Sequence, residues 1–222
     1  MKKYFAAKYL FVVSVISLFA LGGCKKENDD TVTPDPVDTT HVTPVETYPA
    51  PISNTIPKSM IDSLRAAGTL VYSGTNPPII NGIYLMSPDS CIYDNGSASA
   101  GTIYADYKFR FSNQDNSAFT VTVDQKNMVT GVLNTTPVSS YICGSGNNFT
   151  VFILRTLSPL GIEVEQYNVL SGTLTANGVQ NFQNTLYMRS KGADPNNTVV
   201  HAGTIRVFIT GGSGLAASQT IF

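Results

Sequence analysis

The chain has 222 residues and a formal net charge of -1; 42% of its residues are hydrophobic and only 13% are charged. From residue 51 onward nine basic residues face nine acidic ones, so the body lacks the excess of lysine and arginine that binding to a nucleic-acid backbone requires. Trp is absent and His occurs twice, which leaves few candidates for a metal site or a histidine-dependent catalytic centre. We therefore expect no nucleic-acid partner, no metal and no cofactor.

The N-terminal segment has the layout of an export signal. Lys2, Lys3 and Lys8 precede the run 9–21, which is apolar apart from Tyr9 and two serines. This run is shorter than the about 20 apolar residues that cross a bilayer, whereas a charged region followed by a short apolar region is typical of a secretory signal peptide. We predict a signal peptide over residues 1–23, with an uncleaved membrane helix as the alternative.

The four residues Leu21, Gly22, Gly23 and Cys24 resemble the lipobox of bacterial lipoproteins. This resemblance implies cleavage before Cys24 and acylation of its thiol, so that the membrane is a partner through the N-terminal lipid; two or three acyl chains anchor a protein stably where one is marginal. The charged run 25–30 that follows is similar to the export signal of Bacteroidetes surface lipoproteins, which implies display on the outer face of the outer membrane. A plain charged linker is the alternative.

The segment 24–57 reads as a tether that carries the lipidated cysteine. It is rich in Thr, Pro, Val and Asp and has no apolar period of 2 or 3.6, so it cannot bury enough surface to fold alone. Its prolines favour an extended, semi-rigid chain. We predict one domain, residues 58–222, after it.

The domain begins with the one clear helical pattern, over residues 58–67. Met60, Ile61 and Leu64 share one face, and Gly68 is placed as the C-terminal stop. The remaining apolar runs are short and alternate with period 2, which is typical of strands. The predicted strands cover 79–86, 103–111, 119–124, 128–133, 138–143, 149–157, 162–175, 179–189 and 204–210, with Val71 or Ile92 contributing a further one. Residues 149–157 are apolar on both faces and suit a strand covered on both sides.

Helical crossovers between these strands are missing, which excludes a parallel sheet. We expect an all-β, antiparallel barrel with one short N-terminal helix, and a two-sheet β-sandwich is the alternative. Pro77 and Pro78 followed by Gly82, Ile83 and Tyr84 are similar to the start of lipocalin-like barrels, where a Gly-x-aromatic begins the first strand. That resemblance also implies a barrel.

Candidate site residues are tyrosines and cysteines. Aromatic side chains can stack on sugars or line an amphipathic pocket, so we select five tyrosines as candidate ligand contacts, although tyrosine is also ordinary strand composition: Tyr84, Tyr104, Tyr107, Tyr167 and Tyr187. Cys91 and Cys143 lie in an exported, disulfide-permissive chain, and both a disulfide and two separate buried thiols stay open.

Enzyme patterns are weak in this sequence. Glu163 and Glu165 share one face of a strand at a spacing that glycoside hydrolysis allows, and His201 is the only histidine of the body. We expect no catalytic residues and interpret the chain as a surface lipoprotein of the outer membrane that acts as a ligand-binding or glycan-binding accessory module. A structural or protein-docking lipoprotein is the first alternative and a small hydrolase the second; sequence does not identify protein partners.

Overall fold

Strands dominate the described part of the chain, as the alternation of apolar and polar residues predicts. The computed structural model describes residues 45–96, 100–135 and 140–222. The helices are α1 (Ala50–Ser53), α2 (Lys58–Ala66) and the 3-10 helix η1 (Pro159–Gly161). The strands are β1 (Thr75–Asn76), β2 (Gly82–Met86), β3 (Asp89–Asp94), β4 (Ile103–Tyr104), β5 (Tyr107–Asp115), β6 (Thr120–Asn127), β7 (Leu133–Thr135), β8 (Ser140–Ser145), β9 (Asn148–Leu157), β10 (Val164–Thr175), β11 (Gly178–Lys191), β12 (Ile205–Thr210) and β13 (Leu215–Gln219).

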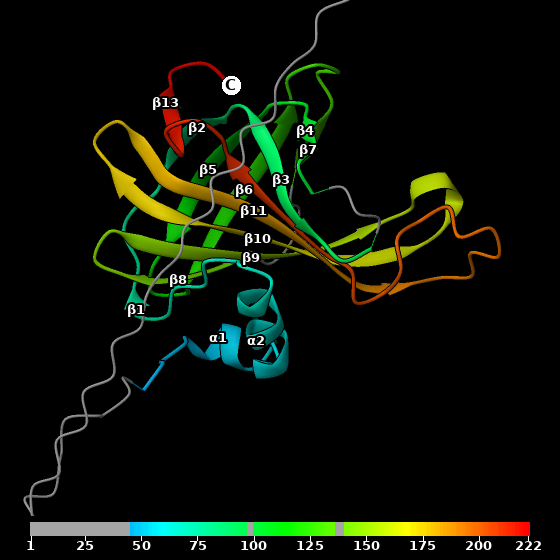
Figure 1. Ribbon diagram of the computed structural model, residues 1–222. Helices are drawn as coiled ribbons and strands as arrows, with labels where there is room; N and C mark the ends of the chain where they lie inside the picture. The colour runs from blue at the N-terminus through cyan, green and yellow to red at the C-terminus, as the bar shows by residue number, and fades with distance from the viewer. Residues whose placement is uncertain (1–44, 97–99, 136–139) are drawn as a thin grey trace, which may run out of the picture. The chain divides into compact units, whose positions relative to one another are not determined.

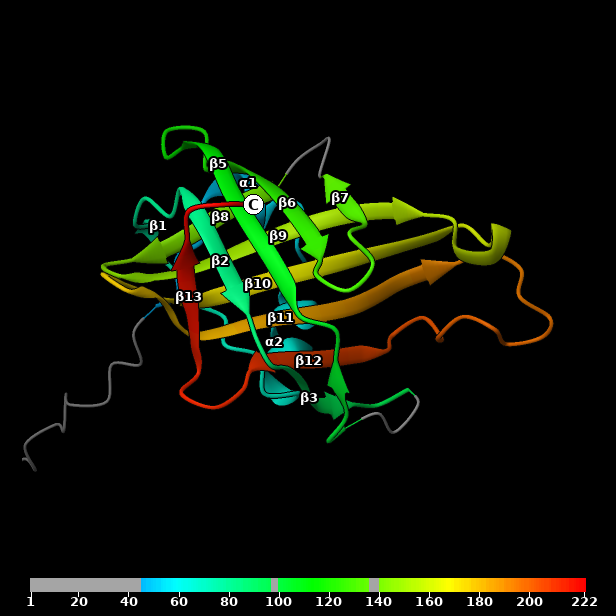
Figure 2. The ribbon, with the colours of Figure 1, turned by 90° about the horizontal axis from the view of Figure 1, so that it is seen from above.

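Eight of these strands close into an antiparallel barrel, which confirms the predicted fold class. The barrel follows chain order as β2, β5, β6, β8, β9, β10, β11 and β13, and the pairing of β13 with β2 closes the ring. Figure 2 shows β2, β5 and β6 lying across β9, β10 and β11 on the opposite wall. Closure pairs the two ends of the meander and so removes the edges that an open sheet would expose.

One side of the barrel is extended by strands that branch from its wall. The long strand β11 pairs with β13 at residues 178–180 and with β12 at residues 183–187. β12 then pairs with β3, and β3 with β4. The chain passes from β2 to β3 through the cis peptide bond between Ser87 and Pro88. We call the end of the barrel from which β12, β3 and β4 branch its branched end.

The interior is filled with apolar side chains at the other end. Along β9 the inward positions 149, 151 and 153 are all buried in the same apolar cluster. Phe149 contacts Phe111 with ring centroids 6.1 Å apart, and Phe109 contacts Phe182 at 5.2 Å, both edge to face, which is a favourable arrangement of aromatic rings. The apolar filling gives way to polar side chains toward the C-terminal end of β9.

The two helices cover the outside of the barrel. Figure 1 shows α1 and α2 against the wall formed by β8 to β11. The apolar face predicted for α2, Met60, Ile61 and Leu64, is buried in one cluster with Phe152 of β9 and Val169 of β10. Strand β9 is therefore covered on both faces, as its sequence predicts.

The predicted boundary between tether and domain is wrong. The described residues from 45 to 57 belong to the same compact unit as the barrel, and Ile52 of α1 and Ile56 are buried in the cluster beneath the helices. The prolines that suggest an extended stalk instead flank helices, because Pro49 and Pro57 are the N-cap residues of α1 and α2. A proline is well tolerated at a helix N-terminus, where a missing amide hydrogen leaves no bond unmade.

Two strand predictions need correction, and β13 was missed. The run 128–133 is mostly turn, since β6 continues through Asn127, whose Oδ1 accepts hydrogen bonds from the amides of Val129 and Thr130 at 2.9 Å each. The strand predicted over 103–111 is divided into β4 and β5. β13 was not predicted, because its sequence Leu-Ala-Ala-Ser-Gln has little β propensity.

Candidate binding cavity

A cavity of about 230 Å³ lies at the branched end of the barrel, where β3, β4 and β12 each contribute a lining residue. It begins where the apolar filling stops, since the next two inward positions of β9 after Ile153 are Arg155 and Leu157, and both line it. Its charged and amide lining comes from Asp89, Gln125, Asn134, Arg155, Gln166, Asn168 and Asn184. Its apolar and aromatic lining includes Tyr104, Tyr107, Leu157, Leu186 and Phe208. Polar groups that converge beside apolar and aromatic side chains are typical of small-molecule sites.

Three buried amides form a chain of hydrogen bonds along one wall. Gln166 donates from Nε2 to Oδ1 of Asn168 at 3.0 Å, and Asn168 donates from Nδ2 to Oδ1 of Asn184 at 3.2 Å. Gln166 and Asn168 share the inward parity of β10 with the core residue Leu170. These bonds fix the orientation of each amide, so the remaining donors and acceptors present a defined pattern to the cavity.

Arg155 is a buried cation in this wall. Its residue exposure is 9%, and its Nε has no hydrogen-bond partner among the residues that the structure describes. Burial lowers the pKa of Arg155 from its ordinary value, and the nearby charge of Asp124 partly opposes that shift. An uncompensated buried charge is costly, so this position needs an explanation.

Asp89 is a second buried charge on the lining. It is 2% exposed, and its Oδ1 also lacks a hydrogen-bond partner within the described residues. Burial raises the pKa of Asp89 to about 7, and the charge of Asp106 raises it further in the same direction. The carboxyl group therefore changes its protonation state near neutral pH.

Aromatic rings form part of the lining. Tyr104 of β4 packs edge to face on Phe208 of β12, with ring centroids 5.3 Å apart. Tyr107 of β5 accepts a hydrogen bond at its hydroxyl oxygen from Nδ2 of Asn127 at 3.0 Å. This contact holds the Tyr107 ring in place at the cavity.

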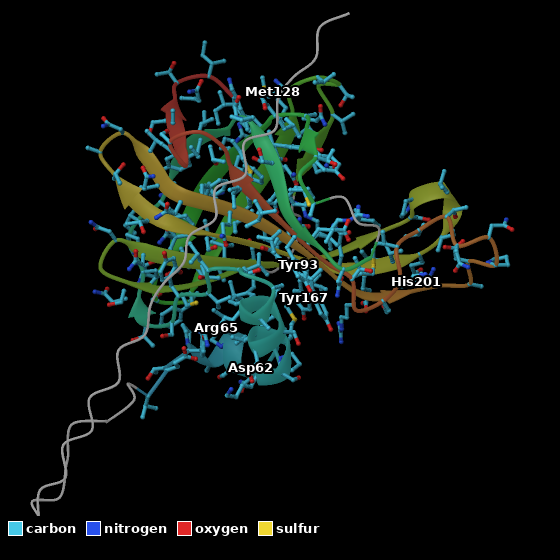
Figure 3. All side chains as sticks on the ribbon, in the orientation of Figure 1. Asp62, Arg65, Tyr93, Met128, Tyr167 and His201 are labelled. Carbon is cyan, nitrogen blue, oxygen red and sulfur yellow. The ribbon has the colours of Figure 1, made fainter. Side chains whose placement is uncertain are left out.

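The five candidate tyrosines fall into three environments. Tyr104 and Tyr107 line the cavity. Tyr84 belongs to the apolar interior, where its hydroxyl donates to the carbonyl oxygen of Ile80 at 3.2 Å. Tyr167 and Tyr187 pack in the outer cluster beneath the helices, and Figure 3 shows Tyr167 on that side of the barrel. Only two of the five therefore share a site.

The two cysteines of the body are free and buried, so the disulfide that we left open is not formed. Cys143 lies on β8 beneath the helices, and its Sγ donates to the carbonyl oxygen of Tyr72 at 3.2 Å. Cys91 lies on β3, where its Sγ donates to the carbonyl oxygen of Tyr93 at 3.4 Å. β3 and β8 are not neighbours in the sheet, and the alternative of two separate buried thiols holds.

The candidate residues of the hydrolase alternative lie away from the cavity lining. Glu163 and His201 are exposed, and Figure 3 shows His201 on a loop that projects beyond the barrel. Glu165 lies 3.5 Å from Nη1 of Arg189 and accepts a hydrogen bond from Ser190. Within 45–96, 100–135 and 140–222, no group of three or more His, Cys, Asp and Glu side chains is placed to hold a metal ion.

The polar groups of the cavity were not identified from the sequence, although the positions of these residues along their strands indicate them. Arg155 has the same parity as Phe149, Val151 and Ile153, and it is the first charged residue on that face of an otherwise apolar strand. Gln166 and Asn168 likewise stand at inward positions before Leu170. Polar residues that occupy inward positions at the same end of several strands predict a polar cavity.

Cys24, the proposed lipidation site, lies outside the described residues. No helix in the described part of the chain has the length and apolar character needed to cross a bilayer. Comparison with protein-family models, with curated proteins and with solved structures found no match to this chain.

Proposed function

We propose that this protein is a lipid-anchored binding protein of the outer membrane whose barrel holds a small polar molecule in the cavity at its branched end. The observation that carries the binding part of this proposal is a pair of buried polar atoms on the cavity lining, Nε of Arg155 and Oδ1 of Asp89, which have no hydrogen-bond partner among the residues that the structure describes. Buried polar groups in proteins are nearly always hydrogen-bonded, and an exception needs an explanation. A bound molecule would supply the missing partners.

The cavity volume limits the size of that molecule. A volume of 230 Å³ corresponds to roughly seven or eight water molecules at about 30 Å³ each. It lies below the 300 to 1,000 Å³ that is ordinary for drug-sized ligands. A single sugar ring or an amino acid fits this volume, whereas a longer molecule would have to extend beyond the lining residues.

The anchor is supported by the sequence alone. The lipobox-like residues that end at Cys24 follow a short apolar run, and the described residues of the folded unit begin at residue 45. A lipid at Cys24 would hold the barrel at the membrane through the intervening segment. Incorporation of labelled palmitate into the full chain, and its loss in C24A together with release from the membrane fraction, tests this part. A C24A protein that stays in the membrane fraction overturns it.

The cavity is tested by blocking it. The chain has no tryptophan, so one introduced Trp is both a plug and a fluorescent reporter. Leu186 lines the cavity and Leu154 lies on the outer face of β9, and each is partly buried. We expect saturation-transfer NMR signals from a mixture of hexoses, hexuronates, N-acetylhexosamines and amino acids with the wild type and with L154W. We expect their loss with L186W. Equal signals from both variants would contradict binding at this cavity.

A further inference from the structure

Arg155 differs from every other arginine of the chain. All five arginines lie in the described residues, and Arg155 is the most buried of them. The other four each have a carboxylate within 4 Å: Arg65 with Glu46 at 2.6 Å, Arg110 with Asp124 at 2.5 Å, Arg189 with Glu165 at 3.5 Å and Arg206 with Asp94 at 2.8 Å. Arg155 is the most buried of the five arginines and therefore has the greatest need of a counterion. In the described part of the chain it is also the arginine without a carboxylate within 4 Å.

The carboxylate whose charge affects the pKa of Arg155 is already paired with another arginine. Asp124 raises the pKa of Arg155 through its charge, but its Oδ2 accepts hydrogen bonds from both Nε and Nη2 of Arg110, at 2.8 and 2.5 Å. A carboxylate held by one guanidinium in this way neutralises that guanidinium first. Arg155 is therefore left with a positive charge at the cavity wall.

The groups around Arg155 fit a hydroxylated molecule. Each amide of Gln166, Asn168 and Asn184 has donor and acceptor capacity beyond the two bonds that join them. Aromatic rings such as Tyr104 present faces and edges on which the C–H groups of a ring can pack. The carboxyl of Asp89, on the lining strand β3, is placed to bond hydroxyl groups.

Building on the proposed binding function, we infer that the cavity takes a small polyhydroxylated acid, a hexuronate, with its carboxylate on Arg155. The planar guanidinium of arginine matches a carboxylate with two parallel hydrogen bonds. The ligand's carboxylate supplies a counterion that the described part of the chain does not place within 4 Å of Arg155, and its hydroxyl groups bond the amides and Asp89. One ring with one carboxylate also agrees with the volume of the cavity.

The experiment is isothermal titration of the full chain in detergent at pH 6. The titrants are glucuronate and galacturonate, their neutral counterparts glucose and galactose, and glutamate as an acid without a sugar ring. We expect the uronates to bind at least tenfold more tightly than the matched hexoses and than glutamate. We expect R155Q to lower uronate affinity at least tenfold while R189Q, a change at an exposed arginine of the same barrel, leaves it unchanged.

A second measurement uses the wild type alone, so it does not require that any variant folds correctly. The Nε–Hε signal of Arg155 in the ¹H–¹⁵N spectrum of the wild type should shift on addition of glucuronate and stay in place on addition of glucose. Hexoses that bind as tightly as uronates, or an Arg155 signal that glucuronate does not move, would refute the inference that the ligand is an acid. Neither result would refute the proposed binding at the cavity. Uronate binding that persists in L186W would instead refute the cavity as the site. Absence of uronate binding to the wild type also refutes the inference.

Discussion

Arg155 on β9 and Gln166 on β10 are direct register partners, and both side chains line the cavity. The Nε2 group of Gln166 is directed to Asn168. Strand pairing thus places the buried cation Arg155 beside an amide that donates its hydrogen bond to another amide. We infer that the buried charge at Arg155 lowers the stability of the fold, as groups in binding sites commonly do.

Replacing the buried cation should therefore stabilise the empty protein. Met has a similar length and no charge, and removing an uncompensated buried charge is often stabilising. We expect R155M to raise the free energy of unfolding by about 1 to 2 kcal/mol in urea denaturation, with R189M, at the exposed arginine, within about 0.5 kcal/mol of the wild type. A loss of stability in R155M would show that Arg155 has partners of its own within the fold.

The stability of the barrel should fall as the pH rises toward neutrality because of Asp89. Its pKa is about 7 in the fold and near its ordinary value of 3.8 in the unfolded chain. Between these values the unfolded chain releases this proton while the folded protein keeps it, so the free energy of unfolding decreases with pH. The decrease is complete once the folded protein also ionises above about pH 7.

The matching variant is D89N, which cannot ionise. A shift of about three pKa units corresponds to on the order of 4 kcal/mol, so urea denaturation at pH 4.5, 6 and 8 should show a clear decline for the wild type and a flatter profile for D89N. Asp62 lies on the exposed face of α2, beside Lys58, and D62N should keep the wild-type slope. The same slope in D89N and the wild type would refute this account of Asp89.

Closure of the barrel should depend on the absence of a side chain at Gly178. Its φ is +142°, and a Cβ there would lie 2.2 Å from the carbonyl oxygen of Ala216, on the strand that closes the ring. Gly146 also has a positive φ, +61°, but a Cβ there would meet nothing within 4 Å. We expect G146A to cost about 1 kcal/mol from backbone strain alone and G178A about 3 kcal/mol or more.

Hydrogen exchange distinguishes local opening from general loss of stability. The amide of Ser218 in β13 donates to the carbonyl oxygen of Asn177 at 3.0 Å. Its exchange should accelerate in G178A more than exchange at amides of the β9–β10 pair. Uniform acceleration of exchange across the barrel would argue against local opening at β13.

The barrel was predictable because most of its strands carry their own signal. Phe109 and Phe111 alternate with polar residues, and the run 149–157 is apolar on both faces, so their burial follows from local pattern. β13 lacks such a pattern, since Ala216 and Ala217 have small side chains, and its place is set by pairing with β2 and β11. Closure is a long-range property that no single segment reveals.

The cavity was only partly predictable, for a related reason. Tyr104 and Tyr107 were selected as aromatic residues, but Tyr84, Tyr167 and Tyr187 were selected on the same ground and lie elsewhere. Composition does not show which end of a strand a side chain occupies. The inward parity of Arg155, read together with that of Asn168, does show it once the pairing of β9 and β10 is known.

The segment before α2 gives the last prediction, because its sequence suggests a stalk and its structure shows a packed element. Ile52 in α1 is fully buried in the outer cluster, whereas Ile221 is 74% exposed. Removing most of a buried isoleucine side chain costs about 2 to 5 kcal/mol, through lost burial and the cavity left behind. We expect a loss in this range for I52A in urea denaturation, and at most about 0.5 kcal/mol for I221A. If I52A were as mild as I221A, residues 45–57 would not belong to the cooperative fold, and the stalk would extend to Pro57 after all.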